Sequence, residues 1–278
     1  MADTYSNNMT RGASETKRLD DQFDLMAENI GYILHPSITL PSAPHICDMG
    51  TGTARFLVRL QPMYPDGTLE GFDISSALYP PKDALPPNVV LSELDVKQPF
   101  LEHMHGKYDL VHVRMLVAAM MPGDWERVIQ NLMKILKPGG FIQWIECDFV
   151  TGEYLGSKPT SRIKTLESLG KAFRATLGEQ FAHGWNTLPD IMRAAGLTSV
   201  FTDIKPSDRV PETREKITEG IQSLVISWAH LMVKRGASET EMFGDTLDNV
   251  EKEVRDEIKS GCYFKYNIHV TCGRRAPV

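Results

Sequence analysis

Residues 45–56 read HICDMGTGTARF, a short apolar run that leads into two glycines one residue apart. Glycine lets the backbone approach a ligand closely, and the free N–H groups of a following helix point toward that ligand. The stretch therefore predicts a strand, a tight turn and a helix that handle a nucleotide. Taken alone, the same pattern is about equally expected where a strand and a helix merely pack together.

The spacing of the small residues argues against a dinucleotide. The pattern G-x-G-x-x-G/A needs a small residue at position 55, and this chain has Arg55 there. Steps of two instead give Asp48, Gly50, Gly52 and Ala54. A carboxylate at position 48 would repel a pyrophosphate but could receive an ammonium group, directly or through water. The turn thus suits a nucleoside that carries an amino acid.

Two further predicted strands each end in an acid. The run 69–75 closes on Asp73, which lies 25 positions after Asp48. A carboxylate at this place can accept hydrogen bonds from both ribose hydroxyls of a nucleotide. The run 89–96 contains Asp95, which could accept a hydrogen bond from an adenine amino group.

These residues resemble the first motif of class I S-adenosylmethionine-dependent methyltransferases, D/E-x-G-x-G-x-G, with Ala54 where the third glycine usually stands. The sequence Lys137-Pro138-Gly139-Gly140 before the apolar run 141–146 is similar to the entry of the family's fifth strand. A predicted fourth strand, 108–114, lacks the Asn/Asp-Pro-Pro-Tyr sequence of many methyltransferases that act on nucleic-acid bases. The glycine turn, Asp73, Asp95 and the Pro-Gly-Gly turn stand in the family's order across 46–148.

The N-terminal part resembles a narrower group. Residues 18–23, RLDDQF, and the later Gly31-Tyr32 look like the N-terminal region of fungal secondary-metabolite methyltransferases, including gliotoxin-type thiol methyltransferases. In that group a histidine commonly follows the glutamine, whereas this chain has Phe23.

The resemblance implies an α/β fold with a Rossmann-like seven-stranded methyltransferase sheet and S-adenosylmethionine as the cofactor. Carried onto this chain, it predicts a set of cofactor-binding residues at the ends of the first four strands: Asp48, Gly50, Thr51, Gly52, Asp73, Ile74, Asp95, Val96, Val113 and Arg114.

The chain is expected to divide into an N-terminal helical lid, 1–40, and a methyltransferase domain, 41–278, with helical insertions near 156–185 and 207–260. An apolar stripe from Leu19 to Leu34 at three- and four-residue intervals predicts the helix of the lid, after a mobile stretch at 1–13. The insertions are expected to contain helices at 212–236 and 239–260. Alternation over 263–272 predicts a final antiparallel strand.

Composition and charge limit the classes of partner that the protein could bind. A net charge of -6 and a pI near 5.8 offer no basic surface for nucleic acid or an anionic membrane. The first twenty residues lack the apolar core of a secretory signal, and no apolar run is long enough to span a bilayer. Four scattered cysteines favour reduced, structural thiols. We therefore expect a cytoplasmic protein that acts on a small molecule; its oligomeric state stays open.

Ligands of open α/β sheets bind beyond the carboxyl ends of the strands, so residues after the fourth and fifth strands should face the reacting methyl group. These residues are Arg114, Met115, Glu146, Cys147, Asp148 and Phe149. Glu146, Asp148 and His183 are the candidate catalytic bases, whereas His112, inside an apolar strand, reads as a core histidine. No His, Asp or Glu cluster has metal-ligand spacing, so no metal is predicted.

Methyl transfer from a sulfonium is an in-line displacement in which the protein aligns the reactants and excludes water. A thiol with a pKa near ~8.5 would need little help from a base. The resemblance to the gliotoxin-type group implies S-methylation of a gliotoxin-like dithiol, with O- or N-methylation of another secondary metabolite as the alternative. Two other hypotheses stay open: a methyltransferase-like regulator of secondary metabolism, and a cyclase that uses the bound cofactor's charge.

Overall fold

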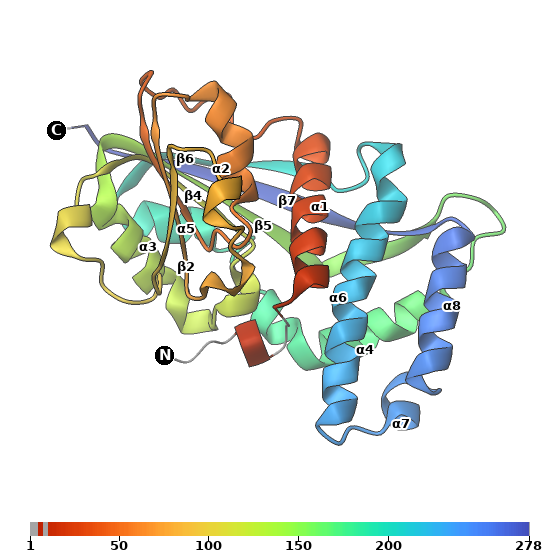
Figure 1. Ribbon diagram of the computed structural model, residues 1–278. Helices are drawn as coiled ribbons and strands as arrows, with labels where there is room; N and C mark the ends of the chain where they lie inside the picture. The colour runs from red at the N-terminus through yellow and green to blue at the C-terminus, as the bar shows by residue number, and fades with distance from the viewer. Residues whose placement is uncertain (1–4, 8–10, 278) are drawn as a thin grey trace.

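The computed structural model describes residues 5–7 and 11–277, whose strands form one seven-stranded sheet in the order β3-β2-β1-β4-β5-β7-β6 (Figure 1). Neighbouring strands are parallel except for β7, which runs antiparallel to both β5 and β6. The predicted α/β fold is thereby confirmed. The strands are β1 (His45–Met49), β2 (Thr68–Asp73), β3 (Val89–Glu93), β4 (Tyr108–Arg114), β5 (Leu136–Gly156), β6 (Leu197–Pro206) and β7 (Cys262–Arg275).

The middle of the sheet is built from continuous apolar runs, as expected for parallel strands that are covered on both faces. Ile46 of β1 lies opposite Leu69 of β2 and Leu110 of β4, and all three side chains are fully buried. The register places the carboxyl ends of β1, β2 and β4 at one edge of the sheet. Any group that follows these strands is therefore brought to the same place.

The strand order reverses between β1 and β4. The helix α2 (Arg55–Leu60) leads from β1 toward β2, whereas α3 (Trp125–Ile135) leads from β4 to β5 on the other side of β1. Because crossovers between parallel strands are right-handed, these helices cover opposite faces of the sheet. α1 (Ala13–Ile30) contacts α2, and α5 (Leu188–Ala194) contacts α3. A crevice for a ligand opens where the order reverses.

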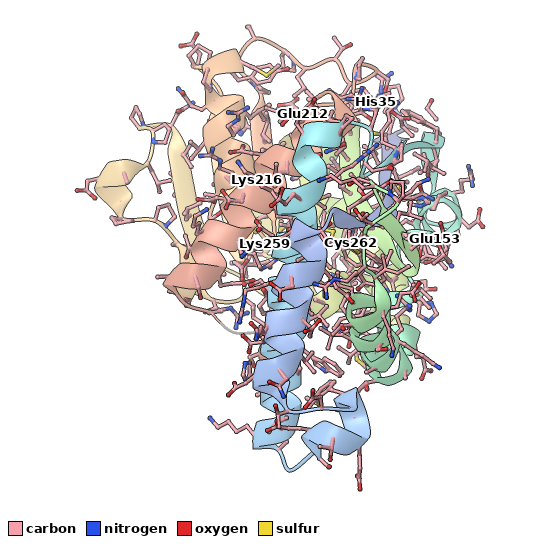
Figure 2. All side chains as sticks on the ribbon, turned by 90° about the vertical axis from the view of Figure 1, so that its right-hand side faces the viewer. His35, Glu153, Glu212, Lys216, Lys259 and Cys262 are labelled. Atoms are coloured by element: carbon pink, nitrogen blue, oxygen red, sulfur yellow. The ribbon has the colours of Figure 1, made fainter. Side chains whose placement is uncertain are left out.

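Strands β5 and β7 continue beyond the rest of the sheet as a two-stranded arm. The pairing resumes after an irregularity between Asp148 and Glu153, and runs to Gly156 opposite Cys262. Helices from the predicted insertions pack on this arm and on α1, as Figure 1 shows. Figure 2 views the molecule from their side, with Lys216 on α6 and Lys259 at the end of α8. The helices are α4 (Lys164–Phe181), α6 (Arg214–Lys234), α7 (Glu239–Phe243) and α8 (Leu247–Lys259).

Two local expectations differ from the structure. Lys137-Pro138-Gly139-Gly140 lies inside β5 rather than before it. The helix expected over 239–260 is broken, because Gly244 adopts a left-handed φ of 80° that ends α7 before α8 begins.

The rest of the described chain forms loops that contain short 3-10 turns. Of the stretch 1–13 that is expected to be mobile, 1–4 and 8–10 lie outside the described residues, whereas 5–7 form such a turn. Within the described ranges, no helix is both long and apolar enough to cross a membrane. The turns are Tyr5–Asn7, Gln61–Met63, Ser76–Leu78, Lys82–Ala84, Glu102–Met104, Val117–Ala119, Pro122–Asp124 and Pro211–Thr213.

Candidate active site

The glycine turn after β1 bends back on itself with three left-handed residues. Gly50, Gly52 and Ala54 have φ values of 73°, 53° and 59°. The N–H groups of Gly50 and Thr51 both donate to the Phe72 carbonyl, at 2.8 and 2.9 Å, which ties the turn to β2. A Cβ at position 50 would lie 2.6 Å from Leu116 Cδ2, so only glycine fits there without movement.

Asp48 is engaged behind this turn. One carboxylate oxygen lies 2.7 Å from His112 Nδ1, and the other accepts a hydrogen bond from the Thr51 hydroxyl at 2.8 Å. The His112 ring is 1% exposed and stacks on Phe56 with ring centroids 3.6 Å apart. Burial lowers the pKa of His112, so the neutral ring donates Nδ1–H to Asp48. Asp48 is 4% exposed, so direct contact with an ammonium group, one of the two modes expected from the sequence, would require the turn to move.

Asp73 is the last residue of β2, and Asp95 lies two residues beyond the end of β3. Asp73 accepts the Gly52 N–H at 3.0 Å and the Ser75 N–H at 3.3 Å. Burial raises the pKa of Asp73, and these two N–H groups partly oppose the rise. Asp95 accepts the Lys97 N–H at 2.9 Å through one oxygen. Each carboxylate therefore keeps acceptor capacity for a ligand.

A first cavity lies over the reversal point, where ligands of such sheets bind. Two of the predicted cofactor-binding residues, Asp48 and Val113, do not line it. Asp48 lies behind the turn, and Val113 is a fully buried core residue of β4. The other predicted residues are brought together in its wall: Gly50, Thr51, Gly52, Asp73, Ile74, Asp95, Val96 and Arg114.

Arg114 brings a buried guanidinium to this cavity. Its Nη1 donates to Gln22 Oε1 at 3.0 Å, and its charge lies 5.2 Å from the Phe23 ring centroid. Burial lowers the pKa of Arg114. Among the described residues no carboxylate forms an ion pair with it, so most of its five N–H donors are available to an anion. Phe23, which replaces the common histidine, thus supports the cation with its aromatic face.

A second, more apolar cavity adjoins the first. Its wall includes the rings of Phe149, Phe173, Phe181 and Phe264 from β5, α4 and β7. Tyr5, Leu19, Gln22 and Met115 line both cavities.

Met115 follows β4 at the junction of the two cavities. Its φ of 55° is unusual for a residue with a side chain. Such strain is found most often at functional sites. Its N–H donates to the Ile145 carbonyl at 2.9 Å, which fixes the junction to β5.

The three predicted catalytic residues line neither cavity. Glu146 is fully buried beneath the turn 117–119, and its Oε1 accepts the Leu116 N–H at 2.9 Å and the Trp144 indole N–H at 2.8 Å. Burial raises the pKa of Glu146 to about 8. Asp148 is 3% exposed and accepts the backbone N–H groups of Val150 and Thr151. His183 follows α4 in a loop. Side chains alternate along a strand, which turns both acids of β5 away from the cavity that Phe149 lines.

Sequence reasoning overlooked the cavity-facing residues of the N-terminal segment. Arg18 and Gln22 lie one helical turn apart on α1, beside Leu19, and a search for polar residues within the apolar stripe could have found them. Tyr5 carried no such signal. Among the described residues, no group of three or more His, Cys, Asp or Glu side chains is arranged to hold a metal ion.

Comparisons with known proteins agree with this geometry. Residues 46–140 match the model of a methyltransferase domain. The methyltransferase grgD of Penicillium sp is 34% identical over 181 residues, which are 60% of this chain and 60% of grgD. The N-methyltransferase tcpN of Claviceps purpurea is 26% identical over 279 residues, 97% of each chain. In fold, the chain is similar to phosphoethanolamine N-methyltransferase 2 of Haemonchus contortus, with a TM-score of 0.55 and 12% identity over 100% of this chain and 61% of that one.

The chain is therefore similar to the class I S-adenosylmethionine-dependent methyltransferases, and the matched domain and the named relatives support this class of enzyme. The relatives grgD and tcpN support the narrower resemblance to fungal secondary-metabolite methyltransferases that the N-terminal sequence indicates. The methyltransferase domain and the similar solved structure also confirm S-adenosylmethionine as the predicted cofactor.

Proposed function

We propose that the protein transfers the methyl group of S-adenosylmethionine to a small natural product bound in the second cavity. The observation that carries the proposal is the pair of adjoining cavities, which share Tyr5, Leu19, Gln22 and Met115. A polar cavity suits the cofactor, and an apolar one suits an organic substrate. The shared residues would surround the methyl group as it moves in line between the two.

In the cofactor cavity, the ribose, the adenine and the carboxylate of S-adenosylmethionine would each meet a group of matching chemistry. Asp73 would accept the ribose hydroxyls, Asp95 the adenine amino group, and Ile74 and Val96 would flank the adenine ring. Arg114, which has no acidic partner among the described residues, would receive the carboxylate. Asp48 would act indirectly, by holding Thr51 and His112 behind the glycine turn.

The helices around the second cavity would act as its lid. α1, within the predicted lid 1–40, contributes Arg18, Leu19 and Gln22, and the insertions contribute α4 and α6. They would exclude water from the reacting atoms, which favours displacement at a sulfonium.

The atom that receives the methyl group is proposed to be nitrogen, with sulfur second. Among the described residues, neither cavity is lined by histidine or glutamate, and Asp73 and Asp95 lie on the cofactor side. Burial raises the pKa of Tyr5, so this shared residue is a poor base. A neutral amine or a thiol needs little help, whereas an alcohol does. Nitrogen comes first because tcpN, matched over 97% of its length, is named an N-methyltransferase.

The test is incubation with isotopically labelled S-adenosylmethionine and panels of apolar amines, thiols and alcohols, read by mass spectrometry. We expect label in an amine product and one S-adenosylhomocysteine per methyl group. Label confined to a thiol would select the second candidate. Cofactor binding with no transfer to any panel or metabolite extract would favour a regulator, and product without S-adenosylhomocysteine a cyclase. The four buried, unpaired cysteines fit the cytoplasm that we propose as the compartment.

A further inference from the structure

The second cavity contains cationic groups that methyl transfer itself does not use. Arg18 of α1 and Arg174 of α4 both line it, and no carboxylate among the described residues does. Neither arginine lines the cofactor cavity. A positive charge in an otherwise aromatic wall is energetically costly unless an anion pairs with it.

Arg18 is held in place by Glu15. Its Nε donates to one oxygen of that carboxylate at 2.8 Å and its Nη2 to the other at 2.6 Å, while the Tyr5 hydroxyl donates to the same carboxylate at 2.7 Å. The side chain of Arg18 is 8% exposed, and its Nη1 is buried without a hydrogen-bond partner. A buried N–H donor left without a partner is energetically unfavourable, so a ligand acceptor at this atom would bind favourably.

Arg174 supplies the charge that remains uncompensated. It lies half-buried on α4, and no ion pair or hydrogen bond within the described residues engages it. Glu15 balances only one of the two guanidinium groups. Glu167, two turns earlier on α4, is exposed to solvent and does not line the cavity. The second cavity therefore carries one excess positive charge.

The neighbouring groove between α1 and α6 is balanced in charge, because three cations that line it, Lys17 among them, accompany three carboxylates. Arg18 borders that groove too, but Asp21, Asp24 and Glu219 already supply carboxylates there, beside Lys216, which Figure 2 labels on α6. Only on the side of the second cavity does the cationic wall lack an acid. An incoming anion would find its partner on that side.

We propose that Arg18 and Arg174 form an anchor for a carboxylate on the substrate, so that the protein acts on aromatic or apolar acids. The carboxylate would accept the free Nη1–H of Arg18 and pair with Arg174, while the rings of Phe149, Phe173 and Phe181 hold the apolar body. The nucleophile would then face the shared residues at the junction. This proposal rests on the proposed function for the placement of the substrate, but the binding of an acid can be tested without methyl transfer.

The test is calorimetry of the full chain with indole-3-acetate and with its methyl ester, which keeps the ring and the carbonyl but loses the charge. Titrations run with and without S-adenosylhomocysteine. We expect the acid to bind at least about tenfold more tightly than the ester, the scale of one charge-assisted hydrogen bond. Arg174→Met should reduce that ratio to threefold or less, and Arg174→Lys should restore part of it.

Lys171→Met is the matched control, because Lys171 is an exposed cation one turn away on α4 and does not line the cavity. It should leave the ratio unchanged. Equal binding of acid and ester by the unmodified protein, or an acid preference that survives Arg174→Met, overturns the anchor. A protein that prefers the acid but does not bind S-adenosylhomocysteine would instead contradict the proposed function.

Discussion

The carboxylate of Asp73 has two roles. It accepts the Gly52 N–H at 3.0 Å, which steadies the glycine turn, and it faces the cavity where we place the ribose. Asp73→Ala should weaken S-adenosylhomocysteine binding by roughly 1.5–3 kcal/mol, because two hydroxyls lose a charged acceptor. Calorimetry measures the loss. Asp66→Ala, at an exposed position outside the cavity, serves as the control. An affinity within twofold of the parent, in a folded variant, would contradict the ribose assignment.

Glu146 should make stability depend on pH. Its folded-state pKa of about 8 lies above its ordinary value of 4.5 because burial disfavours the charge. The folded state therefore holds a proton that the unfolded state releases, so the contribution of Glu146 to stability is greatest below about pH 4.5 and falls as pH rises toward 8. Glu146→Gln mimics the protonated acid and should remove this fall. Relative to the parent, the variant should gain stability with rising pH, on the order of several kcal/mol by pH 8.5.

Urea unfolding between pH 5.5 and 8.5 measures this difference. Glu153→Gln, an exposed change on the same strand, controls for loss of charge and should give a curve parallel to the parent. If the curve for Glu146→Gln is also parallel, Glu146 does not hold a proton in the folded state. Methyl transfer should change little in this variant, because Glu146 lines neither cavity.

At the scale of elements, the turn between β1 and α2 depends on close approach as well as on backbone conformation. Gly50 and Gly106 both have left-handed φ values, 73° and 62°, but only Gly50 has a neighbour where a Cβ would go. Gly50→Ala should therefore destabilise the fold by about 1–3 kcal/mol more than Gly106→Ala, the usual cost of overpacking. Chemical denaturation of the two variants gives this comparison.

The variants Gly50→Ala and Gly106→Ala should also differ in cofactor binding. Gly50→Ala pushes on Leu116, which lines the cofactor cavity, so S-adenosylhomocysteine affinity should fall as well. Gly106 lies outside the cavity, and its variant should bind like the parent. Equal stability loss in both variants would mean that Leu116 yields without cost.

The sequence predicted the elements that obey local rules. Apolar runs that end in Asp73 and Asp95 located two strands and their ligand-facing ends, and the two-residue spacing of Gly50 and Gly52 located the turn. Which face Glu146 takes could not be predicted, because Phe141–Glu146 is apolar on both sides and gives no alternation to read. The contact of Asp48 with His112 could not be predicted from the sequence either, because the two residues are 64 positions apart.

At the scale of the whole molecule, the cofactor cavity joins parts that are distant in sequence. Leu19 and Gln22 of α1 face the glycine turn and Asp73 across it, and α1 also contacts α2, α6 and β6. A ligand in this cavity would bridge the N-terminal helix and the sheet. By linkage, a ligand at 100 times its dissociation constant adds about 2.7 kcal/mol of stability to the state that binds it.

We therefore predict that S-adenosylhomocysteine slows amide hydrogen exchange in two separate regions, the turn 49–55 and the helix α1. Opening of α1 would expose the bound ligand, so the binding energy must be lost before the helix can open. Helix α8 lines neither cavity and should exchange at an unchanged rate, which makes it the internal control. Asp73→Ala, measured at the same ligand concentration, should lose both effects together because it weakens binding rather than the helix. Protection limited to 49–55, with α1 exchanging as in the ligand-free protein, would show that α1 opens independently of the cofactor, and its role as a lid would then have to rest on the substrate.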